Sequence, residues 1–173
     1  MPSPRQLFVL RHAKSSWDDP GLPDHDRPLA PRGRRAVKQL AKHLERNEIR
    51  PARVICSSAR RTIETYEGVS PGGELVVEPE LYEATADGIL ARLRQVPDQT
   101  PSVMVIGHNP ALQTLILRLT GSNGDARGDR DLAEVQRKFP TAALATLSFN
   151  CAWADLAPGS ATLEGLVRPR DLH

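Results

Sequence analysis

The residues best suited to chemistry in this sequence are an Arg-His pair, Arg11 and His12, which directly follow an apolar run. The run, residues 7–10, is typical of a short buried strand. A strand that ends in a sharp turn holds the next side chains at the edge of a sheet. There an imidazole can act as a nucleophile near neutral pH, and a guanidinium offers a planar fork of donors that matches a phosphate group. The pair is therefore placed to grip or attack an anion.

Two further motifs follow predicted strands in the same way. Residues 53–56 lead into a helix start that carries Arg60 and Arg61, and residues 103–106, the most apolar run, lead into a Gly-His-Asn-Pro turn that contains His108. In open α/β sheets, ligands bind at the carboxyl ends of the strands. If the three strands are neighbours, their ends converge on one pocket with two histidines and at least two arginines. Helix N-termini would add amide donors, so the pocket suits a dianion such as phosphate.

Apolar periodicity alternates between strands and helices along the chain. Strands are predicted at residues 7–10, 53–56, 75–77, 103–106, 142–149 and 161–167. Helices are predicted from residue 31 to Asn47, after the potential N-caps Ser57 and Ser58, at residues 86–96 and at residues 110–119. Residues 15–29 and 121–131 are predicted loops, the second a mobile surface loop. The alternation predicts an α/β fold, a three-layer α/β/α sandwich with a mostly parallel central sheet of about six strands.

Composition sets limits on the class of protein. The 173 residues suit a single domain, 1–173, and a net charge of +2 with 4% aromatic residues argues against nucleic acid as a partner. Cys56 and Cys151 lie in apolar runs, which favours buried free thiols in a reducing compartment. The N-terminal residues lack a signal-peptide pattern, and no apolar run approaches the roughly 20 residues that span a bilayer. We therefore expect a cytoplasmic protein with no membrane partner.

These motifs resemble the histidine phosphatase superfamily, which has the phosphoglycerate mutase-like fold, and within it the SixA-type phosphohistidine phosphatases. The resemblance covers nearly the whole chain and rests on Arg-His-Ala at 11–13, the stretch 26–33, the arginine motif at 57–65, Gly-His-Asn-Pro-Ala at 107–111, and 139–145 with Trp153. The register of the arginine motif selects Arg61. Ala13 departs from the glycine of the family signature, but alanine is the smallest replacement, so we expect activity to be retained.

The resemblance implies a metal-independent phosphatase without a cofactor. His12 would form a phosphohistidine intermediate, and the backbone beside it would fix its tautomer. The phosphoryl oxygens would be held by Arg11, Arg61 and a protonated His108. Further substrate-binding residues are expected at Lys14, Ser15 and Asn109.

The proton donor for the leaving group is left open by the sequence. Glu83 follows the third predicted strand, where many superfamily members carry an acidic residue, so the resemblance makes it a catalytic candidate. A solvated loop carboxylate or a structural partner of an arginine would fit the same position. Other ionisable candidates are Asp24, His25 and Asp26 in the first loop.

The short insertions leave room for only a minimal cap, which predicts an open site. An open site suits phosphohistidine on the surface of a protein, the favoured substrate, and it also suits small phosphomonoesters. A mutase would need a closed pocket that keeps water out. The alternative from another class is a non-catalytic phosphate-binding adaptor on the same fold, although the presence of both arginines and both histidines favours an enzyme.

Overall fold

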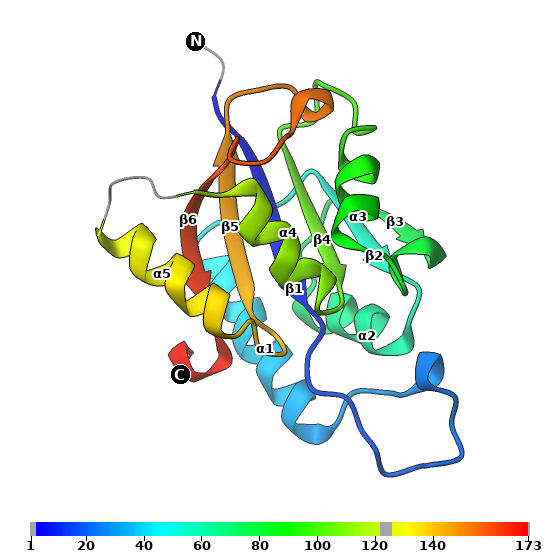
Figure 1. Cartoon of the computed structure of the whole chain (residues 1–173). Coiled ribbons are helices and arrows are strands. Elements are labelled where there is room, and N and C mark those ends of the chain that lie inside the picture. The colour runs from blue at the N-terminus through cyan, green and yellow to red at the C-terminus, as the bar shows by residue number, and fades with distance from the viewer. Residues whose placement is uncertain (1–2, 122–125, 173) are drawn as a thin grey trace.

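The computed structural model describes residues 3–121 and 126–172. In this part of the chain a six-stranded sheet has the order β3-β2-β4-β1-β5-β6 (Figure 1). The strands are β1 (Arg5–Arg11), β2 (Arg53–Ser57), β3 (Glu74–Glu78), β4 (Ser102–Gly107), β5 (Leu144–Phe149) and β6 (Thr162–Val167). The first four are parallel, whereas β5 runs antiparallel to both β1 and β6. The prediction of a mostly parallel sheet of about six strands is confirmed.

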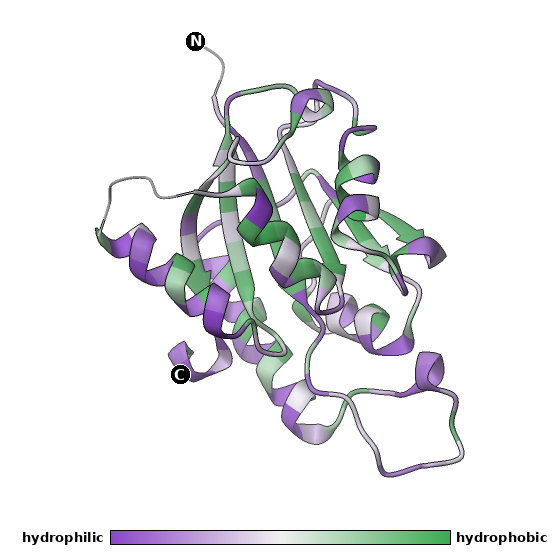
Figure 2. Ribbon diagram, viewed as in Figure 1, coloured by the Kyte–Doolittle hydropathy of each residue, from purple (hydrophilic) through white to green (hydrophobic). Residues whose placement is uncertain are grey.

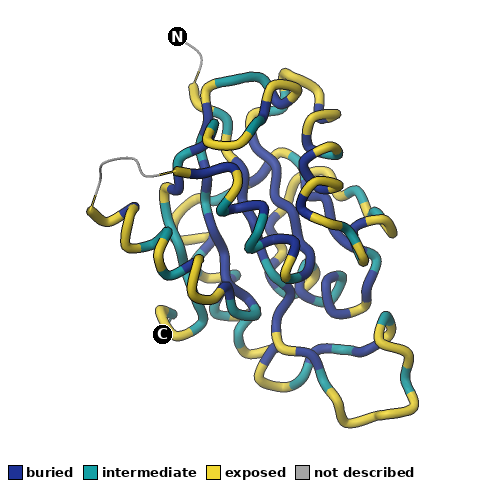
Figure 3. Tube along the Cα trace, viewed as in Figure 1, coloured by how far each residue is buried: buried dark blue, intermediate teal, exposed yellow. Residues whose placement is uncertain are grey.

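Helices cover both faces of this sheet (Figure 1). One face carries α1 (Pro31–Arg46) and α2 (Arg60–Val69); the other carries α3 (Ala86–Leu93), α4 (Ala111–Leu119) and α5 (Ala126–Arg137). Side chains of β1 alternate between two apolar clusters, with Leu7 and Val9 on the α3 and α4 side and Phe8 and Leu10 on the α1 side. The apolar strands and their burial are visible in Figures 2 and 3. The alternation therefore produces the three predicted layers.

The strand register brings the predicted motifs to one edge of the sheet. Arg11, the last residue of β1, pairs with Gly107 at the end of β4. Cys56 of β2 pairs with Ile106 on the other side of β4. The segments that follow β1, β2 and β4 therefore leave the sheet side by side, as the motif positions predicted.

A close backbone contact fixes the chain just after β1. The amide of Ala30 donates to the carbonyl of Lys14 at 2.9 Å, at the point where α1 begins with Pro31 in its first turn. A Cβ atom on Gly33 would lie 2.2 Å from the same carbonyl oxygen. Glycine is therefore required at residue 33 for α1 to pack against the segment that follows the strand.

The structure corrects the prediction of a loop at residues 121–131. Residues from Ala126 onward form α5, and residues 122–125 lie outside the described residues. Only Gly128 and Val135 of α5 are buried. Two buried positions give too weak an apolar period for a helix to be recognised from sequence.

Smaller differences concern a helix cap and the thiols. The N-cap of α2 is Ala59, not a serine, and Ser57 Oγ instead accepts the Ala59 amide at 3.3 Å. Cys56 is buried as predicted, but Cys151 is only half-buried, and both are free thiols. None of the helices within the described ranges is long and apolar enough to cross a membrane.

Candidate active site

Backbone hydrogen bonds hold the segment that contains His12. Its amide donates to the carbonyl of Gly107 at 3.1 Å, and the amide of Ala142 donates to the carbonyls of Arg11 and His12 at 3.1 and 3.0 Å. The next amide, that of Ala13, donates to the hydroxyl of Thr65 on α2 at 2.9 Å. Contacts to three separate elements therefore fix the position of the imidazole before any ligand arrives.

The tautomer of His12 is set by its own chain. Nδ1 lies 2.7 Å from the carbonyl oxygen of Ala13, and because a carbonyl only accepts, Nδ1 carries the proton and Nε2 keeps its lone pair. Burial lowers the pKa of His12 to about 3; the Ala13 contact opposes this shift, while His108 and the two arginines add to it. The imidazole is therefore neutral at physiological pH, and the expectation that the neighbouring backbone fixes its tautomer is confirmed.

The second histidine lies beside the first. The ring centroids of His12 and His108 are 5.4 Å apart, and Nε2 of His108 lies 2.8 Å from the hydroxyl of Ser57. Burial lowers the pKa of His108 to about 4, and the positive charge of Arg61 lowers it further. In the protein without a ligand His108 is therefore neutral, because a buried imidazolium beside an arginine is disfavoured. The expected protonated His108 concerns the state that holds phosphoryl oxygens, and it stays a prediction.

The two predicted arginines complete a cluster that we call the histidine pocket, made up of Arg11, His12, Arg61 and His108. The charges of Arg11 and Arg61 act on both imidazoles, and Arg61 is only 8% exposed. Arg11 donates through Nη1 to the carbonyl of Phe139 at 3.0 Å, which orients its guanidinium. Two fixed cations next to a neutral imidazole form a site that favours an anion with a charge of two.

One of these cations is held by a carboxylate from the first loop. Arg61 donates to the backbone oxygen of Asp24 at 2.8 Å and to its Oδ2 at 3.0 Å, and the phenol of Tyr82 donates to the same Oδ2 at 2.5 Å. The Tyr82 hydrogen bond lowers the pKa of Asp24, and Arg61 lowers it further. Asp24 is therefore an ionised acceptor that positions Arg61, and its lowered pKa makes it a poor proton donor.

Tyr82 also borders the imidazoles. Its ring meets that of His108 edge to face, with centroids 5.6 Å apart, and that of His25 with centroids 4.8 Å apart. Nε2 of His25 lies 2.9 Å from the hydroxyl of Ser58. The sequence did not predict the position of Tyr82 or the contact between Ser57 and His108. Two signals were available: Tyr82 directly precedes the candidate acid Glu83, and Ser57 is the last residue of β2.

Glu83 lies next to Tyr82 in sequence but outside this network. Its side chain is exposed and forms no hydrogen bond or ion pair within residues 3–121 and 126–172. The structure therefore does not bring Glu83 into contact with the histidine pocket, and its role as an acid stays a prediction.

The predicted substrate-binding residues have different environments. The hydroxyl of Ser15 accepts a hydrogen bond from Arg27, whose guanidinium lies 3.5 Å from the ring centre of Trp17. Asn109 donates to the carbonyl of Phe139 at 3.0 Å and accepts from the amide of Gln113. Ser15 and Asn109 therefore brace loops in this structure. Lys14 is exposed and lines a neighbouring cavity.

Comparison with known proteins shows the family of this chain. A model of the histidine phosphatase superfamily (branch 1) matches residues 7–91. An uncharacterised protein of Mycobacterium tuberculosis is 35% identical, over 93% of this chain and 100% of that protein. A protein from Nakamurella multipartitia, assigned as phosphohistidine phosphatase SixA, is 31% identical with a TM-score of 0.84, over 97% of this chain and 98% of that chain. This chain belongs to the histidine phosphatase superfamily.

Superfamily membership supports a hydrolase that acts on phosphate groups. The fold is also shared with the protein histidine phosphatase SixA in complex with tungstate, at 24% identity and a TM-score of 0.75, over 96% of this chain and 98% of that chain. In this chain, the register of β1 and β4 pairs Arg11 with Gly107, so His12 and His108 follow at one sheet edge. Within the described ranges, no group of three or more His, Cys, Asp or Glu side chains is arranged to hold a metal ion.

Proposed function

We propose that this chain is a phosphatase that removes the phosphoryl group from phosphohistidine in a protein, through a phosphohistidine intermediate on His12. The observation that carries the proposal is the state of His12: Nδ1 is tied to the Ala13 carbonyl, and the pKa is lowered to about 3. Nε2 is therefore an unprotonated nucleophile beside two guanidinium groups. The similarity to SixA proteins supports the substrate class.

In the first step, the lone pair of His12 Nε2 attacks phosphorus. The phosphorus–nitrogen bond of the substrate breaks, and its electron pair returns to the substrate imidazole. When that ring carries a proton on its other nitrogen, it departs as neutral imidazole, so the enzyme need not supply an acid. The phosphoryl group is now bound to Nε2, and the bond broken is of the same type as the bond formed.

In the second step, a water oxygen attacks the phosphoryl group on His12. The bond between phosphorus and Nε2 breaks, its electrons restore the neutral imidazole, and the protons of the water remain on the released inorganic phosphate. Nδ1 keeps its proton throughout, because that proton is hydrogen-bonded to the carbonyl oxygen of Ala13. His12 therefore returns to its starting tautomer.

The other pocket residues would stabilise the charge on the equatorial oxygens. Arg11 and Arg61 are oriented by the Phe139 carbonyl and by Asp24, so little reorganisation is needed during transfer. A bound dianion favours the protonated form of His108, which then becomes a third donor. The SixA complex with tungstate, an anion of similar shape to phosphate, supports a site of this kind.

The test uses two substrates, a phosphohistidine peptide and p-nitrophenyl phosphate, with a chelator present. We expect His12→Ala to lower kcat on the peptide by about 10³-fold or more, because no other group can accept the phosphoryl. His43→Ala is the matched control, since His43 lies on α1 and contacts Asn47. Acid quenching with labelled substrate should trap a phosphoenzyme only when His12 is present. Equal turnover by wild type and His12→Ala would contradict the proposal.

The same assay separates the other candidate functions. Rapid turnover of the ester with none of the peptide would instead indicate a phosphatase of small phosphomonoesters. Phosphate binding without turnover of either substrate would indicate an adaptor. If chelator abolishes activity, the metal-independent mechanism is wrong.

A further variant tests the proposed acid. If Glu83 protonates leaving groups, Glu83→Gln lowers ester hydrolysis far more than hydrolysis of the phosphohistidine peptide, whose leaving imidazole needs no donor. Glu80→Gln, an exposed neighbour, is the control. An equal effect on both substrates would remove Glu83 from the acid role.

A further inference from the structure

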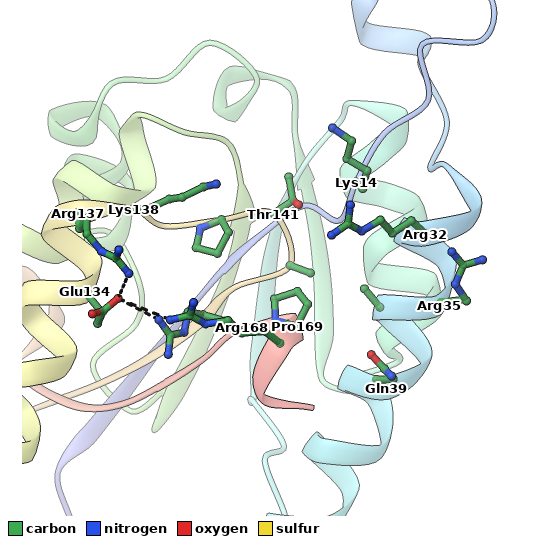
Figure 4. Close-up of a pocket in the computed structure, with 14 residues that line it drawn as sticks. Lys14, Arg32, Arg35, Gln39, Glu134, Arg137, Lys138, Thr141, Arg168 and Pro169 are labelled. Carbon is green, nitrogen blue, oxygen red and sulfur yellow. Dashed lines mark hydrogen bonds and ion pairs between the residues drawn. The ribbon is translucent and has the colours of Figure 1, made fainter. Parts of the chain in front are cut away.

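A second cationic feature, which we call the basic groove, lies beside the histidine pocket. It is a cavity of about 600 Å³ between α1, the end of α5 and the turn that follows β6 (Figure 4). Among the described residues that line it are seven basic side chains, Lys14, Arg32, Arg35, Arg137, Lys138, Arg168 and Arg170, and one acidic side chain, Glu134. The whole chain is nearly balanced, with 23 basic and 21 acidic residues, so the excess of positive charge is local.

Three of these cations share one carboxylate within the groove. Glu134 accepts from Arg137 at 2.7 Å and from Arg168 at 3.0 Å, and Arg170 lies 3.9 Å away. The four remaining cations, Lys14, Arg32, Arg35 and Lys138, are exposed, and their side chains form no hydrogen bond or ion pair with the part of the chain that is described. The groove therefore presents uncompensated positive charge to solvent.

The groove and the histidine pocket share parts of the backbone. Lys14 lies two residues beyond His12, and the amide of Ala142, another lining residue, donates to the carbonyls of Arg11 and His12. Register places both features at the same end of the sheet, because Leu10 pairs with Leu144, and Leu144 with Val167 just before Arg168. The lining of the groove therefore begins within two residues of the nucleophile, at the same end of the sheet.

We propose that the basic groove docks an acidic stretch of the phosphoprotein whose phosphohistidine enters the histidine pocket. The proposal rests on the proposed function and names the surface that would select the substrate. Long, exposed cations suit the capture and orientation of carboxylates on a partner protein. None of the described lining residues is aromatic, whereas single-stranded nucleic acid is bound by stacking bases on aromatic rings.

The experiment uses two phosphohistidine peptides of equal length, one with four flanking glutamates and one with four flanking glutamines. The groove variant carries Arg32→Gln, Arg35→Gln and Lys138→Gln, and it leaves Lys14 unchanged. The control variant carries Lys38→Gln, Lys42→Gln and Arg46→Gln, which removes the same charge from exposed positions of α1 outside the groove.

At low salt, we expect wild type and control to prefer the glutamate peptide by about tenfold in kcat/KM. The preference should fall to about one in the groove variant, while all three proteins hydrolyse the glutamine peptide at similar rates. A preference that survives in the groove variant, or that falls equally in the control, would overturn the docking proposal.

Binding of the unphosphorylated glutamate peptide, followed by fluorescence anisotropy, separates docking from catalysis. Weaker binding to the groove variant alone supports the groove even if no peptide is hydrolysed, in which case only the proposed function fails. Equal binding to all three proteins would overturn the proposal that the basic groove docks the peptide. Stronger binding of a single-stranded oligonucleotide of equal charge than of the peptide would also overturn it, because the groove would then favour nucleic acid.

Discussion

The histidine pocket and the basic groove are both cationic and lie side by side, yet burial makes them physically different. The pocket residues His12, Arg61 and His108 are 7%, 8% and 9% exposed, whereas the four unpaired cations of the groove are classed as exposed. Fixed charges in a site with little water interact strongly with one group at one position. Exposed charges are screened by salt and attract a partner without fixing it in place. Similar charges would therefore serve the proposed transfer in the pocket and the proposed capture in the groove.

The largest expected effect tests the fixed charge of the pocket. Arg61→Ala should lower kcat/KM by about 10²- to 10³-fold, because an oriented donor to the transferring phosphoryl group is lost. The matched control is Arg60→Ala, since the exposed Arg60 pairs with Glu64 instead. Steady-state kinetics on the phosphohistidine peptide provides the measurement. Similar losses in the two variants would show that buried and exposed arginines do not differ here.

The pH dependence sharpens the same contrast. For a histidine with an ordinary pKa near 6.5, the fraction of unprotonated, nucleophilic imidazole would fall about tenfold for each pH unit below that value. Because the pKa of His12 is lowered to about 3, its contribution to kcat/KM should stay flat down to about pH 4. A loss of kcat/KM with a midpoint near pH 6.5 for both the phosphohistidine peptide and p-nitrophenyl phosphate would contradict the argument that burial lowers the pKa of His12.

Stability should respond to the same shift. Between pH 6.5 and the lowered pKa values of His12 and His108, the unfolded chain binds more protons than the folded protein. Their neutral forms therefore favour folding above pH 6.5, and this contribution is lost as the pH falls below 6.5. The midpoint temperature of thermal unfolding should accordingly fall less steeply between pH 7 and pH 4 for His108→Gln than for wild type.

A packing prediction follows for the segment shared by the two regions. Gly33→Ala should lower the free energy of unfolding by about 1–3 kcal/mol, because the new Cβ would lie 2.2 Å from the Lys14 carbonyl oxygen. It should also lower kcat/KM by displacing the segment after His12. Gly88→Ala is the control, since its Cβ would lie 3.5 Å from the Thr85 hydroxyl. Urea unfolding measures the stability of both variants. Equal stabilities would show that the segment around the Lys14 carbonyl moves to accept the new Cβ without cost.

The smallest expected effect concerns the link between Tyr82 and Asp24. Tyr82→Phe removes one hydrogen bond but leaves the Arg61 contacts with Asp24, so kcat/KM should fall only about three- to tenfold. Tyr66→Phe, on α2, is the control. If Tyr82 merely positions Arg61, the loss should be similar for the ester and the phosphohistidine peptide. A loss above about 100-fold on the ester alone would instead make Tyr82 the proton donor.

Local sequence patterns were sufficient for much of the fold. Short apolar runs such as residues 53–56 and 103–106 predicted strands, because a strand buried on both faces must be apolar throughout. The polar residues at their ends predicted which side chains would meet, since parallel strands share one carboxyl edge. The pattern failed at α5, in which only Gly128 and Val135 are buried.

The sequence by itself predicted that Arg11, His12 and His108 would meet, because each lies at or just after the end of a strand whose direction the fold class dictates, and the family resemblance selected Arg61. Only the tertiary structure decided their electrostatic state. Burial makes both histidines neutral, and the contact between Asp24 and Tyr82 joins residues 58 positions apart. The basic groove likewise combines cations from α1, α5 and the C-terminal turn. Local patterns carry no information about these pairings, since burial and long-range contacts arise only when the layers pack together.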